Sequence, residues 1–490
     1  MRILCLGNNT EDTDLQTTQH ANANNSINYG LVTQHTDLTN IKDGWYHTSV
    51  YDITPGDIVR ISKYFDSVMI LDQPKELWDH PDAFFNTIKL AKLLPSVLRA
   101  NTTMFDDYWD NLVKSNNSFC IFPFIELLVQ NGSTTVCCRS QTQVTTLEKI
   151  KDYKTDAAYE SIRSKMLTGI QIPEHCSSCY NIEQKGMQSA RQQETVEWAN
   201  RLNIDTVDDL RLINSPVYYE VRPSNNCNLQ CRTCGPVYSK LLQKEYNDLG
   251  LHDPQKQYTY TGFEFINISK IKKLYVSGGE PTAMPEFYEF LRSCIADNKT
   301  DFEFLVNTNA HKISKTLLTL GKKFSNLQYI VSIDGFKKAN DYTRWPSNWK
   351  NTIENIRKLT ARHKVTFNIT LSIYTIFSFS KLIKFLQSEF PESLIHCQYA
   401  NNGVASYTPF IIKYTDDQIA ELLTLKETSI YKGDTLFASF VDNVIRSASN
   451  SVLDIDSLRK FFDFNDRLDV SRSVIIDNYI LEFKELRTLL

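Results

Sequence analysis

Residues 217–235 read VYYEVRPSNNCNLQCRTCG. The stretch opens with aromatic and β-branched residues, which predict a β-strand, and continues into three cysteines, Cys227, Cys231 and Cys234. Three thiolates do not by themselves complete a four-coordinate structural zinc site. They can bind three irons of a [4Fe–4S] cluster and leave the fourth iron open. The sequence therefore predicts an iron–sulfur centre directly after a strand, with a zinc site or unligated thiols as the alternative.

Strand-like and helical stretches alternate through residues 215–400. The predicted strands are Val217–Val221, Lys273–Val276, Phe302–Val306, Tyr329–Ile333, Val365–Ile373 and Ser393–Tyr399. The predicted helices between them are Ser239–Leu249, Glu286–Ile295, Lys315–Phe324, Trp349–Arg362 and Phe379–Phe390. This alternation predicts an α/β fold, a parallel sheet curled into a partial (β/α)6 barrel with helices on its outer face. In such folds the chemistry lies in the loops that follow the strands.

The composition of the 490 residues excludes several classes of protein. Hydrophobic residues make up 42% and charged residues 22%, which is typical of a globular chain and not of a disordered or fibrous one. A net charge of -4 argues against a partner such as long nucleic acid. The longest apolar stretch, residues 119–129, is too short to span a membrane, and the N-terminus does not read as a secretory signal. We expect a cytoplasmic protein with no membrane partner.

A second group of cysteines precedes the first. It consists of Cys120, Cys137, Cys138, Cys176 and Cys179. The chain has eleven cysteines in all, and so many in a cytoplasmic chain indicate metal ligands more than disulfides. Cys137 and Cys138 end a predicted strand, and neighbouring strand residues point to opposite faces, so only one of them is expected to be a ligand. We favour a four-thiolate set of Cys120, Cys138, Cys176 and Cys179. Zinc is the alternative to iron at this site.

The chain is predicted to contain four parts. Residues 1–112 form a small α/β unit with strands at Arg2–Gly7 and Asp66–Leu71 and a helix at Ala83–Leu98. Residues 113–205 hold the upstream cysteines on a hairpin followed by a helix. Residues 206–400 form the strand–helix core. Residues 401–490 form a helical extension, for which packing is a sufficient explanation.

The hairpin is predicted from a turn signal between two strand-like runs. Phe124–Val129 and Thr134–Cys138 are the strands, and Gln130-Asn131-Gly132-Ser133 is the turn. The helix after it is predicted at Ala157–Leu167.

Cys-Asn-Leu-Gln-Cys-Arg-Thr-Cys at 227–234, with Gly278-Gly279-Glu280-Pro281 downstream, resembles the core of the radical S-adenosylmethionine (radical SAM) superfamily. The resemblance covers residues 215–400. It implies that the open iron binds the amino and carboxylate groups of SAM. An electron from the reduced cluster then cleaves SAM to a 5′-deoxyadenosyl radical, which abstracts hydrogen from a substrate. In such enzymes the protein binds and orients the cofactors and excludes water.

The same resemblance implies contacts with SAM at the ends of successive strands. The residues are Gly278, Gly279 and Glu280, then Asn307 and Thr308, then Ser332 and Asp334, and then Arg344. Glu280 is expected near the amino group of SAM, and Arg344 is expected to pair with its carboxylate through a bidentate fork. The alternatives are plain turns at Gly278-Gly279 and Asp334-Gly335, and a solvated surface position for Arg344. The resemblance assigns no catalytic residue of the protein itself.

The order Cys-x2-Pro-Phe, Asn-Gly turn, Cys-Cys, Arg163 on a helix, and Pro-x2-Cys-x2-Cys resembles the SPASM and twitch modules of that superfamily. The shorter, twitch-like form with one auxiliary [4Fe–4S] cluster is the closer match, although here the module precedes the core. Glu183, Ser189 and Arg191 follow the last cysteine. They are candidates for the substrate side of the module, or else ordinary residues of a helix surface.

These resemblances imply a radical SAM enzyme acting on a ribosomally made peptide. Radical chemistry on a small-molecule metabolite is the second hypothesis, and a non-catalytic iron–sulfur or zinc scaffold is the third. The family also implies an electron donor such as flavodoxin or ferredoxin.

Overall fold

The computed structural model describes residues 2–6, 28–32, 67–70, 97–99, 103–140, 142–251, 258–400 and 408–490. The chain forms two compact units. One comprises Met1–Ser115 and Gln192–Val207, and the other comprises Asn116–Arg191 and Asp208–Leu490. The domain boundaries expected at residues 112, 205 and 400 stay predictions.

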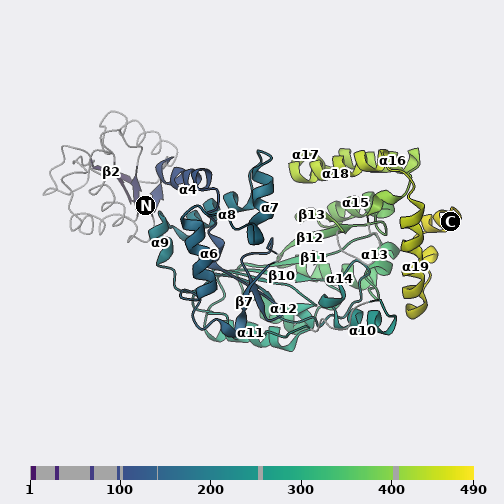
Figure 1. Cartoon of the computed structure of the whole chain (residues 1–490), viewed down its shortest axis with the longest axis horizontal. Coiled ribbons are helices and arrows are strands. Elements are labelled where there is room, and N and C mark those ends of the chain that lie inside the picture. Colours follow the sequence, from purple (N-terminus) through teal and green to yellow (C-terminus); the bar gives the residue numbers. More distant parts are fainter. Residues whose placement is uncertain are drawn as a thin grey trace. The chain divides into compact units, whose positions relative to one another are not determined.

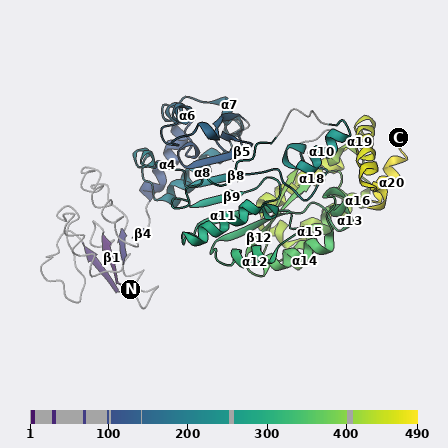
Figure 2. The same cartoon turned by 90° about the horizontal axis from the view of Figure 1, so that it is seen from below.

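The first unit contains a parallel sheet (Figure 2). Its strands are β1 (Arg2–Leu6), β2 (Asn28–Val32), β3 (Ser67–Ile70) and β4 (Val97–Arg99), in the order β2-β1-β3-β4. The first and third confirm the strands predicted at Arg2–Gly7 and Asp66–Leu71. The helix predicted at Ala83–Leu98 is wrong at its end, because Val97 and Leu98 pair with β3 as a strand. Residues 83–96 of that prediction lie outside the described residues.

Two helices contribute to this first unit. They are α4 (Thr103–Ser115) and most of α8 (Ala190–Leu202). The buried indole of Trp109 in α4 donates a hydrogen bond of 2.8 Å to the carbonyl oxygen of Ile204, just after α8. Because a buried indole N–H needs an acceptor, this bond ties the two chain segments of the unit together.

The second unit is built on one sheet, which in the described residues has nine strands (Figure 1). The strands are β5 (Glu126–Gln130), β6 (Ser133–Thr135), β7 (Gln143–Thr146), β8 (Tyr218–Arg222), β9 (Lys273–Val276), β10 (Glu303–Thr308), β11 (Leu327–Ser332), β12 (Lys364–Leu371) and β13 (Leu394–Tyr399). Their order is β13-β12-β11-β10-β9-β8-β5-β6-β7. The pairs from β13 to β5 are parallel, and β6 pairs antiparallel with β5 and β7. All six strands predicted after residue 215 are confirmed, while closure into a partial barrel stays a prediction.

Helices follow the parallel strands and cover one face of the sheet (Figure 1). They are α10 (Lys240–Asp248), α11 (Pro285–Ala296), α12 (Lys315–Gly321), α13 (Lys338–Thr343), α14 (Trp349–Thr360) and α15 (Phe379–Glu389). Burial alternates along β10, where Phe304 and Val306 lie in the apolar core and Leu305 and Asn307 on the opposite face are half-buried. This alternation is the period-2 pattern from which the strands were predicted.

The hairpin with the upstream cysteines extends the same sheet, since β5 pairs with β8. Around it lie α5 (Phe122–Ile125), α6 (Ala157–Leu167), α7 (Pro173–Glu183) and α9 (Val207–Arg211). Asn131 and Gly132 turn the chain with φ of 52° and 70°, the backbone that an Asn-Gly hairpin turn requires. The first strand begins at Glu126 and not at Phe124, because Pro123 starts a short helix. The second strand ends at Thr135, before Cys137 and Cys138.

The residues after 408 are helical, as predicted. The helices are α16 (Asp416–Leu423), α17 (Ser429–Gly433), α18 (Thr435–Ser449), α19 (Ile455–Arg472) and α20 (Glu482–Arg487). Across the described residues, no helix has both the length and the apolar character that crossing a membrane requires.

Candidate functional site

The loop after β8 carries Cys227, Cys231 and Cys234 and is anchored through its backbone. The amide of Gln230 donates to the carbonyl oxygen of Trp345 at 2.7 Å, and the amide of Arg232 donates to that of Thr343 at 2.7 Å. The Cys231 side chain is buried, while Cys227 and Cys234 are half-buried. The three thiols therefore lie on a loop that is anchored to residues 342–345, here called the segment of Arg344.

The surroundings of this loop disfavour the thiolate forms of its three cysteines. Burial, followed by the neighbouring Cys231, raises the pKa of Cys227 to about 12, and burial also raises the pKa values of Cys231 and Cys234. The Arg344 guanidinium acts in the opposite direction on all three thiols. Thiolates buried in this way require a cation as partner. The donor set of free thiols beside a guanidinium suits an iron–sulfur cluster.

A [4Fe–4S] cluster and a single metal ion require different arrangements of the three thiols. Across the described residues, no group of three or more His, Cys, Asp or Glu side chains is arranged to hold a metal ion. In a [4Fe–4S] cluster each thiolate binds an iron of its own. The loop is therefore a candidate for a cluster, and its role as a ligand set stays a prediction.

Gly278 and Gly279 follow β9 and approach the loop closely. Their φ angles are 75° and 38°, a region that favours glycine. A Cβ on Gly279 would lie 2.3 Å from the carbonyl oxygen of Asn226. The amide of Glu280 donates to that same oxygen at 2.7 Å. The two glycines thus let the end of β9 pack against the residue before Cys227, so they do more than make a plain turn.

We expect Gly279→Ala to destabilise the protein. The added Cβ must displace backbone and occupy a strained φ, which costs about 1–3 kcal/mol. Urea unfolding of the full chain measures the loss. Gly433→Ala is the control, because a Cβ there meets nothing within 4 Å. Equal stability of the two variants would contradict the close packing described above.

Glu280 is buried and joins the ends of β9 and β10. Its carboxylate accepts hydrogen bonds from the hydroxyls of Thr282 at 2.6 Å and Thr308 at 2.7 Å, and from the amide of Asn309 at 2.7 Å. Burial raises its pKa, and these donors oppose that rise. Glu280 and Thr308 therefore contact each other, and the expected contact of Glu280 with the SAM amino group stays a prediction.

Asn309 is a site residue that the sequence analysis did not select. Its amide nitrogen donates to Asn228 at 2.7 Å and lies 3.9 Å from the sulfur of Cys227. The only signal was its place beside Asn307 and Thr308 at a strand end. Which of these adjacent polar residues turns toward the cysteine loop depends on the backbone after β10, where Ala310 has a φ of 51°.

Ser332, Asp334 and Arg344 complete the predicted set. The Ser332 hydroxyl donates to the Asn307 side chain at 3.3 Å. Arg344 donates to Asp334 at 2.8 Å, and the amide of Thr370 donates to the other carboxylate oxygen of Asp334 at 3.0 Å. The Arg344 side chain is only 13% exposed, so the alternative of a solvated surface position is wrong. Asp334 is likewise buried and paired.

Arg344 stays charged in this setting. Burial alone would lower its pKa, but the Cys231 thiol and the Asp334 carboxylate outweigh that effect and raise the pKa. The structure thus gathers the cysteine loop, Glu280, Asp334 and Arg344 at one end of the sheet, where the parallel strands finish.

Comparison with known families agrees with this geometry. Residues 221–386 match the family model of the Radical SAM superfamily. The chain carries a radical SAM domain. This domain is that of an enzyme, and SAM binding belongs to it.

Three solved structures are among those to which this chain is similar. SuiB of Streptococcus suis bound to S-adenosylmethionine is 16% identical over 58% of this chain and 61% of its own, with a TM-score of 0.31. TYW1 with a lysine–pyruvate adduct is 18% identical over 44% and 74%, with a TM-score of 0.27. The radical SAM methyltransferase TsrM of Kitasatospora setae is 11% identical over 84% and 75%, with a TM-score of 0.26. The match thus spans less than two thirds of SuiB. No curated protein sequence matches the chain.

Outside the radical SAM domain, the upstream cysteines differ in burial, and Cys138 is the exposed one among them. Burial raises the pKa of Cys120 most, and the neighbouring Cys176, Cys137 and Cys179 raise it further. Burial raises the pKa of Cys138 to about 12, Glu220 and Glu126 raise it further, and Arg139 and Arg222 oppose the rise. Cys137 is thus among the thiols that raise the pKa of Cys120, whereas Cys138 is exposed.

The argument that favoured Cys138 is therefore corrected. Both cysteines lie in a turn after β6, so the alternation of a strand does not apply to them. Cys176 and Cys179 follow the helix predicted at Ala157–Leu167 and lie on a helix of their own, α7.

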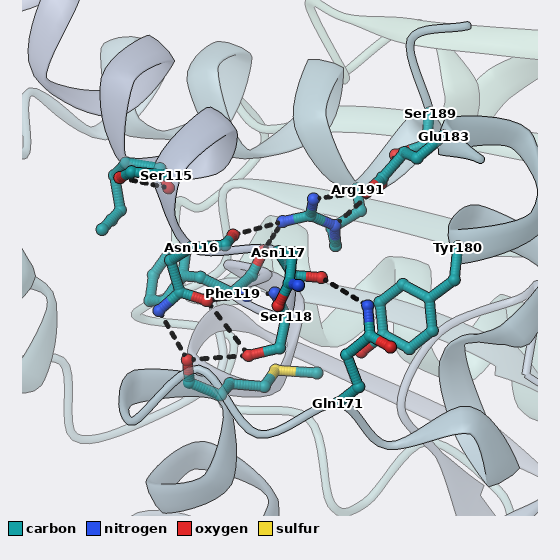
Figure 3. A network of polar contacts seen from close by, with 12 residues as sticks. Ser115, Asn116, Asn117, Ser118, Phe119, Gln171, Tyr180, Glu183, Ser189 and Arg191 are labelled. Carbon is teal, nitrogen blue, oxygen red and sulfur yellow. Dashed lines mark hydrogen bonds and ion pairs between the residues drawn. The ribbon is translucent and has the colours of Figure 1, made fainter. Parts of the chain in front are cut away.

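Glu183, Ser189 and Arg191 bind one another and the segment before Cys120 (Figure 3). Arg191 makes a bidentate pair with Glu183 at 2.7 and 2.9 Å, and Ser189 donates to the same carboxylate at 2.5 Å. Arg191 also donates to the carbonyl oxygens of Asn116 at 3.1 Å and Phe119 at 2.7 Å. Since Arg191 is only 2% exposed, these are not ordinary residues of a helix surface.

Proposed function

We propose that the protein cleaves SAM reductively at a [4Fe–4S] cluster bound by Cys227, Cys231 and Cys234, and that the resulting 5′-deoxyadenosyl radical abstracts hydrogen from a substrate. The observation that carries the proposal is the loop of three free thiols packed against the segment of Arg344 at the strand ends. When bound, the cluster supplies the electron that cleaves the C–S bond of SAM.

The protein's own groups would bind and orient SAM. Arg344 uses one terminal nitrogen for Asp334 and keeps other donors of its planar fork for a carboxylate. Gly278 and Gly279 present backbone next to the loop. Ser332 and Asn307 offer hydroxyl and amide groups on the face of the sheet opposite to the apolar core. Thr233 stands where many members of the superfamily have an aromatic residue, so stacking on adenine is not assigned to it.

Anaerobic reconstitution tests this function. The chain loaded with iron and sulfide, then given dithionite and SAM, should release 5′-deoxyadenosine. Absence of that product with a loaded cluster would overturn the proposal.

We further infer an auxiliary cluster on Cys120, Cys137, Cys176 and Cys179, with Cys137 in place of Cys138. Three of these thiols are buried, and their mutual effects on the pKa of Cys120 support a common site. The module lies close to the core in the fold, because β5 and β8 are neighbours in one sheet. A twitch-like role in accepting an electron from a product radical follows from the resemblance. Zinc is the alternative that the sequence left open for a four-thiolate site, although the upstream thiols, like the rest of the described residues, form no group arranged to hold a single metal ion.

Cys179→Ala should remove one cluster of two. The iron content is expected to fall from about eight to about four per chain if both sites hold [4Fe–4S] clusters. Release of 5′-deoxyadenosine should persist in part, while formation of the modified product should stop. Cys138→Ala is the matched control and should keep the iron content of the unmodified chain. Loss of iron from the Cys138 variant, with retention in Cys137→Ala, would restore the original assignment.

We propose a ribosomally made peptide as the substrate class, with a small-molecule metabolite as the second candidate. The peptide proposal rests on the resemblance to a twitch-like module. We also propose a cytoplasmic location and a flavodoxin or ferredoxin as electron donor. The rate of SAM cleavage is measured with candidate peptides and, separately, with metabolite mixtures. Stimulation by a peptide supports the first substrate class, and stimulation by a metabolite supports the second.

A further inference from the structure

The C-terminal helix α19 buries a row of polar residues among its apolar ones. Asn465, Asp469 and Arg472 are buried together with Phe461 and Leu468. A buried amide or charge is costly unless it is paired, so packing alone does not account for these three side chains. Each of the three is paired. Asn465 and Asp469 bind Arg232, Arg472 binds Glu245, and Asp469 also binds Tyr342. Asn465 has two further partners, the hydroxyl of Tyr374 at 2.8 Å and the carbonyl oxygen of Phe461 at 2.7 Å.

The first partner is Arg232, which lies between Cys231 and Cys234. Its fully buried guanidinium donates to Asn465 at 2.9 Å and to Asp469 at 2.5 Å. The guanidinium also lies 3.7 Å from the centroid of the Tyr342 ring, within the range of a cation–π contact. A residue of the cysteine loop is thus held by α19 through its side chain and by Thr343 through its backbone.

The second partner is the segment of Arg344. The Tyr342 hydroxyl donates to Asp469 at 2.9 Å, on the same carboxylate oxygen that receives Arg232. The amide of Ile476 donates to the other oxygen at 2.8 Å. One carboxylate therefore connects the cysteine loop with the segment of Arg344.

Arg472 makes the third connection. It forms a bidentate pair with Glu245 of α10 at 2.9 and 2.7 Å, and Glu245 also accepts a hydrogen bond of 3.0 Å from Gln230 of the cysteine loop. The guanidinium lies 5.1 Å from the Trp345 ring centroid. Its Nη1 is buried and has no hydrogen-bond partner within the described residues. Helix α19 lies beside α10 and α13 in both views of the chain (Figures 1 and 2).

We propose that Asn465, Asp469 and Arg472, here called the α19 clamp, are positioning residues of the SAM site. They hold the cysteine loop and the segment of Arg344 in a fixed relation, so that a cluster on the loop and the carboxylate partner Arg344 meet one SAM molecule together. The inference rests on the proposed function for the identity of the cofactors. The connection between the two segments does not depend on it.

Asp469→Asn tests the clamp, with Asp466→Asn as the control on the same helix. Asp466 also pairs bidentately with an arginine, Arg487, at 2.7 and 2.9 Å, but Arg487 belongs to α20 and not to the cysteine loop. Amide hydrogen exchange of the full chain, before and after iron loading, is followed in peptides covering residues 227–234 and 342–345. Because hydrogen bonds to a charged group are lost, exchange in both peptides should speed up roughly tenfold or more in Asp469→Asn. It should not change in Asp466→Asn.

The same variants are then assayed with SAM. Asp469→Asn keeps all three thiols, so its iron content should equal that of the unmodified chain. Its KM for SAM should rise about tenfold with a much smaller change in kcat, which is the signature of lost binding. The SAM-dependent change of the reduced cluster's electron paramagnetic resonance signal should need correspondingly more SAM. A merely structural role would lower stability in both variants without separating KM from kcat.

Tyr342→Phe is the second variant in case Asp469→Asn does not fold. It removes a single hydrogen bond to Asp469 and should give the same pattern with smaller shifts. Exchange and KM in the Asp469 and Tyr342 variants equal to those of Asp466→Asn would overturn the clamp. If the unmodified chain itself shows no response to SAM, the proposed function fails, and the exchange experiment alone then decides the clamp.

Discussion

Cys231→Ala should abolish the release of 5′-deoxyadenosine. Cys231 is the middle thiol of the loop and the buried one of the three, and a cluster with two remaining ligands on this loop loses its attachment to the protein. If both proposed sites hold [4Fe–4S] clusters, iron should fall by about four per chain. The measurements are iron content, the absorbance of the reconstituted protein and product formation with dithionite and SAM.

Cys294→Ala is the control for this experiment. Cys294 is also fully buried, but it packs in the apolar core on α11, where a thiol behaves as a small hydrophobic group. Its replacement should leave iron content and SAM cleavage intact. Product formation by the Cys231 variant at the rate of the Cys294 variant would contradict the assignment of the loop.

Glu183→Leu should be the most destabilising change in the upstream module. It leaves the buried guanidinium of Arg191 without its carboxylate partner, and a buried charge that loses its partner costs about 3–5 kcal/mol. Arg191 also donates to the carbonyl oxygens of Asn116 and Phe119, so the loop that leads into Cys120 should loosen as well. Denaturant unfolding of the full chain measures the loss.

Glu389→Leu is the matched control for the ion pair. Glu389 pairs with Arg357 at 2.6 Å at the surface, where the side chains are 33% and 53% exposed, and such pairs contribute about 0–1 kcal/mol. We expect the two variants to differ by several-fold in lost stability. Similar losses would show that the Arg191 network does not stabilise the module.

The sequence predicts best where the signal is local. The residues of β10 and β12 predict strands whose bounds differ by a few residues from the observed ones. This works because the pattern of a strand lies in its own consecutive residues. The Asn131-Gly132 turn is predicted for the same reason. The short spacing of Cys227, Cys231 and Cys234 likewise needs no knowledge of the tertiary structure.

The sequence predicts less well where an element's end depends on other segments. The helix expected at Ala83–Leu98 ends as a strand, because β4 pairs with β3. The alternation argument for Cys138 does not apply, because β6 stops at Thr135 and the chain then turns. The choice between Cys137 and Cys138 as a ligand stays a prediction. For β4, a partner elsewhere in the chain overrides the local pattern.

Read by itself, the sequence determined the strand–helix order of the core, the three-thiol loop and the glycines beside it. Each of these follows from residues within one element or one loop. Only the tertiary structure decided that Arg344 pairs with Asp334, that Cys137 and Cys138 lie in a turn after β6, and that α19 holds the cysteine loop. Asp469 and Arg232 are 237 residues apart in the chain. Their contact depends on how helices and loops pack, and hydrophobic periodicity does not encode which buried polar groups become partners.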